Sequence, residues 1–190
     1  MNWYFVRHGE IASNKKKIYS GRSSEKLTQV GQKQAQKVSS ELTGLEIDAI
    51  FSSPLKRTLQ TSEIIRNELY GDIPIYYDNN FNEIKMGPWE GLSEQKIAEE
   101  DPDHWAIWNS SPADLVLRGR ETLQQLQSRV IDGLQNIERN NAYNSVLIVT
   151  HVAVIRVTTI FASGNDLNTY KSIMVDNAQV FKFENNLSFL

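Results

Sequence analysis

The chain opens with a run of apolar residues that stops at chemically functional side chains. Residues 3–6 are Trp, Tyr, Phe and Val, and such a run is typical of a strand covered on both faces. Arg7, His8 and Gly9 follow directly, and Gly9 permits a backbone turn. Because ligands bind at the carboxyl ends of strands in open α/β sheets, the pattern predicts a buried strand that presents His8 to a ligand.

An amphipathic helix is predicted after a polar, aperiodic loop at residues 11–26. Thr28 stands where an N-cap is expected, and the helix should end near Gly44. Its apolar positions recur at spacings of three and four residues, the period of one helix face: Ala35, Val38, Leu42 and Leu45. We expect these side chains to pack on the sheet.

A second strand and helix follow. Residues 48–52 predict a short strand, after which Ser53 is the expected N-cap of a helix with Pro54 at its first position. This register places Arg57 in the first turn. The expected buried stripe of the helix is Leu55, Leu59, Ile65 and Leu69. Residues 73–77 predict a third strand.

The pattern becomes irregular over residues 79–119, which contain the sequence Gly-Pro-Trp-Glu-Gly at 87–91 and short helical pieces. Long irregular segments inside compact domains are usually functional, so we interpret this one as an inserted segment that covers the substrate. Regular spacing returns at residues 123–137, which predict an amphipathic helix.

The last part of the chain predicts a strongly apolar strand at residues 145–150, followed by His151 and an apolar helix over 152–162. A final pair of strands is expected at 178–183 and 187–190. Strands and helices thus alternate along the chain, which predicts an α/β fold with a mostly parallel sheet and helices on both faces.

Composition and charge narrow the class of protein. The 190 residues contain no Pro/Gly/Ser-rich linker, so we expect a single domain over 1–190. A net charge of -3 offers no general attraction for nucleic acid or an anionic membrane. The absence of cysteine excludes disulfides, thiolate nucleophiles and Cys-ligated zinc. No apolar stretch is long enough to span a bilayer, and a cytoplasmic location is expected.

Functional side chains follow three of the predicted strands. Arg7 and His8 follow the first, Arg57 lies shortly after the second, and His151 ends the strand at 145–150. The carboxyl ends of parallel strands meet at one edge of a sheet, so we expect these four side chains to share a crevice. Arginine binds phosphate oxygens bidentately and stays charged at any working pH. The cluster therefore predicts a phosphate site.

If the bound phosphate group is cleaved from an ester, the departing alcohol needs a proton donor, and we expect a carboxyl group in that role. The best-placed candidate is Glu83, just before the 87–91 loop, but Glu10 and Glu90 remain alternatives on these residues alone. Signatures of several other chemistries on phosphate esters are absent, because the chain has no Cys nucleophile, no P-loop and no Asp-x-Asp after a strand.

The chain resembles the histidine phosphatase superfamily, also called phosphoglycerate mutase-like proteins, over most of its length. The resemblance is carried by several blocks in the family's order: Arg7-His8-Gly9-Glu10 with Asn14, residues 27–35, residues 52–61 with Arg57, residues 82–91 with Glu83, and Thr150-His151 with Ile155-Arg156. It implies a three-layer α/β/α sandwich.

The resemblance also implies residue roles. His8 is the expected nucleophile, Glu83 the acid and base, and His151 the second histidine, with Arg7 and Arg57 holding the phosphate. Substrate contacts are expected from Asn14, Gly21 and Arg22. Metal and cofactor are not required, because the arginines supply the positive charge that magnesium would otherwise provide.

The chain departs from the family pattern at several positions. Val152 and Ala153 replace two glycines after the second histidine, and they add side chains beside the phosphate pocket. Ser24 and Lys26 replace an Asp and a Pro, and Ile11 replaces a Thr. These departures bear on substrate identity more than on activity, since none removes a catalytic group.

Three functions are compatible with these residues. The chain is short and its 87–91 loop resembles that of phosphatases, so a metal-independent phosphomonoesterase working through a phosphohistidine is favoured. Candidate substrates are α-ribazole 5'-phosphate, sugar phosphates, phosphoglycolate and phosphoserine. A phosphoglycerate mutase-type phosphotransferase and a non-catalytic module that binds a phosphorylated ligand are the alternatives. A homodimer is one of the oligomeric states compatible with the sequence.

Several further polar and aromatic side chains have two possible roles. Arg22, Arg118 and Arg120 either bind a second anionic group of the substrate or lie solvated on the surface. His104 is expected at the surface or in packing. Trp105 and Trp108 are expected to pack under the inserted segment, with one of them an alternative wall of the pocket.

Overall fold

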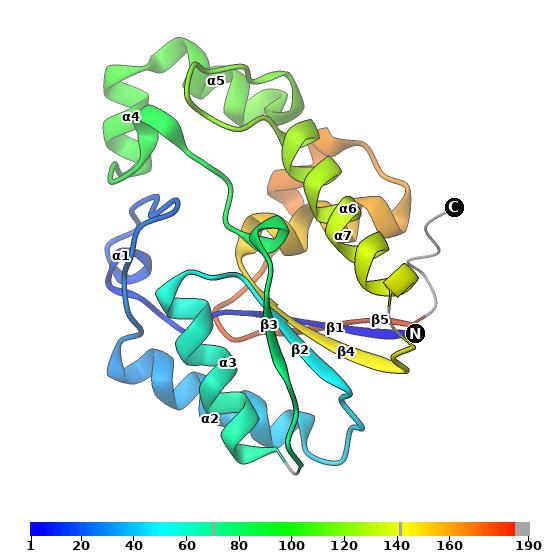
Figure 1. The fold of residues 1–190 in the computed structure, drawn as a ribbon. Helices are drawn as coiled ribbons and strands as arrows, with labels where there is room; N and C mark the ends of the chain where they lie inside the picture. The colour runs from blue at the N-terminus through cyan, green and yellow to red at the C-terminus, as the bar shows by residue number, and fades with distance from the viewer. Residues whose placement is uncertain (70, 141, 185–190) are drawn as a thin grey trace.

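A central sheet of five strands organises the molecule (Figure 1). The structure is a computed structural model, and it describes residues 1–69, 71–140 and 142–184. The strands are β1 (Asn2–Arg7), β2 (Ala49–Ser52), β3 (Ile75–Tyr77), β4 (Ser145–Thr150) and β5 (Val180–Glu184). Their order across the sheet is β3-β2-β4-β1-β5. The first four run parallel and β5 pairs antiparallel with β1, which confirms the mostly parallel sheet.

Helices cover both faces of this sheet. The helices α2 (Gln29–Leu42) and α3 (Lys56–Glu68) lie on one face, and α6 (Leu123–Asn140) and α7 (Val152–Ser163) on the other (Figure 1). The side chains of alternate residues of β1 point to opposite faces of the sheet, as strand geometry requires. Tyr4 and Val6 belong to the core with α2 and α3, whereas Trp3 and Phe5 belong to the core with α6 and α7. The three-layer sandwich is therefore confirmed.

The strand register brings the functional side chains together at one edge. Arg7 at the end of β1 lies opposite Thr150 at the end of β4, and Ser52 of β2 lies opposite Val149. The backbone N–H of His8 donates to the carbonyl of Thr150 at 3.0 Å. The loops that follow β1, β2 and β4 therefore start side by side.

Close backbone contact fixes the loop after β1 against the start of α2. A Cβ atom on Gly9 would lie 2.2 Å from the carbonyl oxygen of Gly31, and one on Gly31 would lie 2.2 Å from that of Glu10. Thr28 caps α2 as expected, because its Oγ1 accepts from the Gly31 N–H at 3.0 Å. Only glycine at both positions permits this approach.

The predicted start of α3 is wrong. The helix begins at Lys56 with Leu55 as its N-cap, rather than at Pro54. The Ser53 hydroxyl accepts from the Leu55 N–H only at 3.4 Å, because it also donates to Asn82 Oδ1 at 2.8 Å and contacts a ring nitrogen of His151 at 2.9 Å. Arg57 nevertheless lies in the first turn, as predicted.

The predicted buried stripe of α3 is also largely wrong. Only Ile65 of the four leucine and isoleucine positions is fully buried. The inward face instead carries polar side chains, because it packs against the site rather than against the middle of the sheet: Arg57, Thr58, Thr61 and Ser62. In α2, Leu45 lies beyond the end of the helix and is 38% exposed.

The segment at 79–119 is built from short helical pieces, as expected. They are η1 (Asn79–Phe81), η2 (Gly87–Trp89), α4 (Glu94–Glu100), α5 (Pro102–Ser110) and η3 (Pro112–Asp114). Trp89 and Trp108 are buried in the core on the α6 and α7 side, and Trp105 packs against it. His104 is half-buried and contacts Asp101 at 2.7 Å. The segment thus shares a core with the rest of the molecule.

The remaining elements are α1 (Ala12–Lys15) and η4 (Leu167–Ser172). The strand predicted from 178 starts at Val180, because Ala178 has a positive φ of 57° and forms a turn. The strand predicted at 187–190 lies outside the described residues. Among the described residues, no helix combines the length and apolarity needed to cross a bilayer.

Candidate active site

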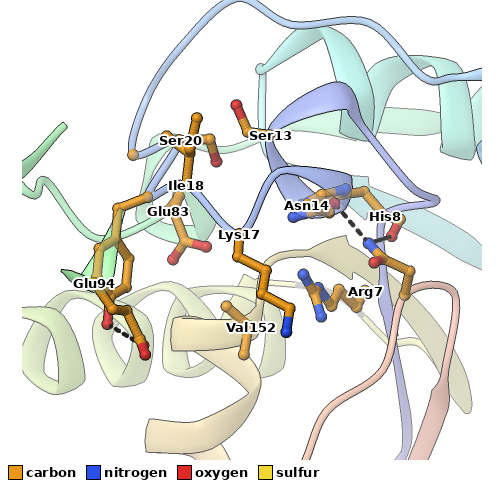
Figure 2. Close-up of a pocket in the computed structure, with 13 residues that line it drawn as sticks. Arg7, His8, Ser13, Asn14, Lys17, Ile18, Ser20, Glu83, Glu94 and Val152 are labelled. Atoms are coloured by element: carbon orange, nitrogen blue, oxygen red, sulfur yellow. Dashed lines mark hydrogen bonds between the residues drawn. The ribbon is translucent and has the colours of Figure 1, made fainter. Parts of the chain in front are cut away.

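A pocket of about 380 Å³ opens at the edge where the parallel strands end. Figure 2 shows the side chains around it, which come from the end of β1, from α1 and the segment that follows it, from the segment after η1, from the starts of α4 and α7, and from the segment before β5. The lining residues are Arg7, His8, Ser13, Asn14, Lys17, Ile18, Tyr19, Ser20, Gly21, Glu83, Glu94, Val152 and Asn177. Five of the eight predicted site residues are among them.

His8 has its ring orientation set by the backbone. The ring Nδ1 lies 2.7 Å from the carbonyl oxygen of Gly9, and a carbonyl only accepts, so Nδ1 carries the proton. The neutral ring then has its lone pair on Nε2. His8 is 2% exposed, and its ring centroid lies 5.2 Å from that of His151.

Arg7 lies in the pocket with one buried donor unused. Its Nη1 donates to the carbonyl of Val175 at 2.7 Å. Its Nε is buried and has no hydrogen-bond partner among the described residues. An unpaired buried N–H is costly, so an acceptor such as an anionic oxygen would be stabilising there.

Arg57 is fully buried and held by backbone carbonyls. Its Nη1 donates to the carbonyl of Ser23 at 2.8 Å and its Nη2 to that of Gly21 at 2.7 Å. Its Nε donates to Nδ1 of His151 at 3.3 Å. Gly21 has a positive φ of 48°, and a Cβ there would lie 2.1 Å from Oε1 of Glu90, so the turn that presents its carbonyl requires glycine.

His151 lies behind His8 and does not line the pocket. Because Nδ1 accepts from Arg57, the ring proton is on Nε2, which donates to Ser53 Oγ at 2.9 Å. Ser53 in turn donates to Asn82 Oδ1. Both ring nitrogens of His151 are thus engaged within the protein, whereas the sequence predicted that it faces the common crevice.

Glu83 is the carboxylate that the structure brings beside His8 and Arg7. It is 7% exposed and lines the pocket, and its Oε1 accepts from the N–H of Ile84 at 2.9 Å. Of the other two candidates, Glu10 accepts from Thr28 and Glu90 accepts from the N–H of Arg22. Neither is among the pocket-lining residues.

Burial shifts the pKa values of His8, His151 and Glu83. Desolvation, followed by the positive charges of Arg57 and Arg7, holds the pKa of His8 well below its usual range. Burial and the charge of Arg57 lower the pKa of His151 in the same way. Burial raises the pKa of Glu83 in spite of the positive charges of Arg57, Arg7 and Arg129. Both histidines are therefore neutral near pH 7 and the carboxyl is biased toward its protonated form.

Asn14 lines the pocket as expected, together with a residue that the sequence did not reveal. Oδ1 of Asn14 accepts from Ile11 N at 3.1 Å and from Nδ2 of Asn177 at 3.0 Å. Asn177 also donates to the carbonyl of His8 at 3.1 Å. In sequence, Asn177 is only a turn former ahead of a strand, so no signal marked it.

The predicted arginines at a second anion site lie outside the pocket lining. Arg22 donates through Nε to the carbonyl of Glu83 at 3.0 Å and through Nη2 to Glu121. Arg120 is buried, with its Cζ 4.4 Å from the ring centroid of Trp108. Arg118 is exposed. Arg22 therefore contacts the backbone behind Glu83 rather than the pocket.

Arg129 on α6 holds the same segment from the other side, and sequence reasoning missed it. It donates to the carbonyls of Asn80, Asn82 and Glu83, and its remaining bonds go to the Glu121 carboxylate at 2.6 and 3.0 Å. In the sequence, Arg129 is one of several polar positions of an amphipathic helix. The pattern cannot show which carbonyls lie opposite it, so its role could not be predicted.

The departure at residues 152–153 has the predicted effect at one position. Val152 lines the pocket beside Arg7 and His8, whereas Ala153 is buried in the core.

Within the described parts of the chain, no group of three or more His, Cys, Asp or Glu side chains is arranged to hold a metal ion.

Two curated relatives match this chain in sequence over most of their length. Phosphoserine phosphatase 1 of Hydrogenobacter thermophilus is 30% identical over 173 residues, which cover 91% of this chain and 81% of the relative. The uncharacterized phosphatase PhoE of Bacillus subtilis is 30% identical over 161 residues, covering 85% of this chain and 77% of that protein.

Solved structures agree with the fold. The structure of YhfR from Bacillus stearothermophilus superposes with a TM-score of 0.90 at 29% identity, covering 96% of this chain and 90% of the other. The sequence model of the histidine phosphatase superfamily (branch 1) matches residues 3–186. With this match over nearly the whole chain, the protein belongs to the histidine phosphatase superfamily.

Proposed function

We propose that this protein is a phosphomonoesterase that hydrolyses a small phosphorylated metabolite through a phosphohistidine at His8. One observation carries the proposal: the Nδ1 proton of His8 is held by the Gly9 carbonyl, which leaves Nε2 as a lone pair in a pocket shared with Arg7 and Glu83. A neutral imidazole held in one tautomer is the form that a nucleophilic histidine needs.

In the first step, Nε2 of His8 attacks phosphorus as the bond to the leaving oxygen breaks. Arg7 and Arg57 stabilise the negative charge on the phosphoryl oxygens. Protonated Glu83 gives its proton to the departing alcohol, which its raised pKa favours. The products of this step are the free alcohol, N-phosphorylated His8 and the Glu83 carboxylate.

In the second step, the Glu83 carboxylate takes a proton from a water molecule as its oxygen attacks phosphorus. The nitrogen–phosphorus bond breaks, its electron pair returns to Nε2 of His8, and inorganic phosphate leaves. Glu83 is protonated again, so the cycle closes without a metal or a cofactor. The two buried guanidinium groups supply the positive charge.

His151 acts in this scheme through Arg57 and through its ring contact with His8. Its unprotonated Nδ1 fixes the direction of the Arg57 Nε–H, and its neutral state avoids a third positive charge beside His8. Gly21 and Ser23 fix the other end of the same guanidinium. Asn14 offers its Nδ2 to the substrate, and Arg22 positions the Glu83 backbone.

The size of the pocket supports a small substrate. Relatives are named for phosphoserine and for α-ribazole phosphate, and either ester, a sugar phosphate or phosphoglycolate is within the capacity of about 380 Å³. The pocket is open to solvent through exposed residues of the α1 loop, which admits the water that the second step requires and favours hydrolysis over phosphoryl transfer between alcohols.

The test is phosphate release from p-nitrophenyl phosphate and a panel of metabolite monoesters, with a metal chelator present. We expect turnover by the native protein and loss of at least a hundredfold in His8→Ala, roughly the contribution of a covalent nucleophile. If no ester is hydrolysed but one binds tightly, the protein is a phospho-ligand-binding module. If release occurs only after priming with a bisphosphorylated ester, it is a mutase.

A further inference from the structure

Lys17 occupies a backbone position that favours glycine. It follows α1 with a positive φ of 54°, and the two hydrogen bonds of the turn are Lys17 N to Asn14 O at 3.1 Å and Ile18 N to Ser13 O at 3.0 Å. These bonds form the Schellman motif, whose left-handed position is usually glycine. A lysine there costs free energy relative to glycine, which points to a use for its side chain.

The Lys17 side chain is directed into the pocket. Figure 2 shows it extending from the α1 turn into the space between Glu83 and Arg7, and it belongs to the pocket lining. In the part of the chain that the structure describes, no carboxylate lies within ion-pair distance of its ammonium group. Arg7 and Lys17 are the cations of the lining, whereas Arg22 and Arg120 are engaged elsewhere.

We propose that Lys17 binds a second anionic group of the substrate, so that the preferred ester carries a carboxylate besides the transferred phosphoryl group. This inference rests on the proposed function of the site. Lys17 is exposed at the mouth, whereas His8, which accepts the phosphoryl group in the proposed function, is buried. The ammonium group is thus placed for the part of the substrate that remains after phosphoryl transfer.

Glu94, another residue of the pocket lining, disfavours a substrate carboxylate near itself and so favours its binding near Lys17. Glu94 lines the pocket and accepts from the Tyr19 hydroxyl at 2.9 Å. Its negative charge repels a substrate carboxylate, and the other outer lining groups, including Ser13 and Ser20, are neutral. Lys17 is therefore the group of the outer pocket that can attract an anion.

The test compares esters that differ by one carboxylate. O-Phosphoserine is paired with O-phosphoethanolamine, and 3-phosphoglycerate with glycerol 1-phosphate. For each pair, the ratio of kcat/KM values is measured in the native protein, in Lys17→Gly and in the control Lys16→Gly. Glycine relieves the strained backbone at 17, so the variant should fold. Lys16 is exposed and outside the pocket lining.

We expect the native ratio to favour the carboxylated ester and to fall about tenfold in Lys17→Gly, the size of one charge-assisted hydrogen bond. Lys16→Gly should keep the native ratio. A loss common to both esters cancels in the ratio. An unchanged ratio in Lys17→Gly, or a native ratio that favours the ester without a carboxylate, would overturn the inference while leaving the phosphatase intact.

A binding measurement separates this inference from the proposed function. Titration calorimetry in the His8→Ala background, with and without Lys17→Gly, reports affinity for the same esters without turnover. We expect Lys17→Gly to weaken 3-phosphoglycerate about tenfold more than glycerol 1-phosphate. If the native protein hydrolyses nothing, the phosphatase proposal fails and this comparison still decides the role of Lys17, with equal losses refuting it.

Discussion

Glu83 illustrates how a single residue depends on its surroundings. Its carboxyl is buried near Arg57, Arg7 and Arg129, yet desolvation dominates and raises its pKa. A buried carboxyl that keeps its proton can serve as a general acid. Sequence alone could not choose it over Glu10 and Glu90, because burial and access to the pocket are tertiary properties.

We predict that Glu83→Gln separates esters by their leaving groups. Glutamine keeps the shape of the side chain but has no acidic proton, so an alkyl phosphate should lose roughly a hundredfold in kcat/KM. p-Nitrophenyl phosphate has a leaving group that needs little protonation, and it should lose much less. Steady-state kinetics on both esters provides the measurement. Equal losses for the two esters would contradict the role of Glu83 as an acid.

The buried histidines predict how stability depends on pH. Their pKa values are lowered in the folded state, so below the ordinary value of 6.5 the unfolded chain binds more protons. The free energy of unfolding should therefore fall as pH drops from 7 to 5, by roughly 1 kcal/mol per pH unit for each histidine. Glu83 acts in the opposite sense, because its raised pKa keeps a proton in the folded state above pH 4.5, and it offsets part of this loss.

Urea unfolding at several pH values measures this slope. Replacing His8 with glutamine, which cannot titrate, should flatten it. A free energy of unfolding that stays constant or rises between pH 7 and pH 5 in the native protein would contradict the buried, neutral state of the histidines.

At the scale of elements, β1, β2 and β4 were predictable because each is a short, continuous apolar run, and most helices because each has a periodic apolar face. The start of α3 was not, because Ser53 bonds to His151 and Asn82, which are remote in sequence. Its polar inner face was hidden for the same reason, since Thr61 supplies an acceptor for the Gly9 N–H at 3.2 Å. Local pattern predicts an element, whereas its register against the site depends on partners far along the chain.

Arg129 shows how α6 supports the site from outside the pocket. It joins the helix to the carbonyls of the segment at 80–83 and to Glu121, whose carboxylate also accepts from Lys85 N. This network sets the position of Glu83, although Arg129 is not a pocket-lining residue.

We predict that Arg129→Lys lowers kcat roughly tenfold or more with a small change in KM, because an ammonium group cannot reach the same carbonyls and Glu83 shifts. Arg139→Lys, an exposed change on the same helix, should behave like the native protein. Steady-state kinetics measures both constants. If Arg129→Lys raises KM while kcat is unchanged, Arg129 supports substrate binding rather than the position of Glu83.

For the whole molecule, we propose that residues 1–190 form one cooperative domain in which the segment at 79–119 is integral. Trp89 and Trp108 are buried in the same core as Trp3 of β1. Urea unfolding followed by tryptophan fluorescence and by far-UV circular dichroism should therefore give coincident transitions. Loss of the fluorescence signal at lower urea than the dichroism signal would contradict this and indicate a segment that unfolds separately.

The molecule as a whole was more predictable than its site. Five blocks of sequence identified the family and four pocket residues, Arg7, His8, Asn14 and Glu83, because chemically functional side chains next to predicted elements are visible in a linear pattern. Lys17 and Asn177 were not visible, because each is an ordinary turn residue until the fold brings it to the pocket. Arg57 and His151 were recognised, but only the structure shows them as a buried layer behind His8.

The most direct test of the account is to trap the phosphorylated enzyme. A 32P-labelled monoester is mixed with the protein in the presence of chelator, and the reaction is quenched in alkali within milliseconds. We predict base-stable, acid-labile label on the native protein and on His104→Ala, and none on His8→Ala. Hydrolysis by the native protein without any such label, or label that persists in His8→Ala, would contradict the phosphohistidine mechanism.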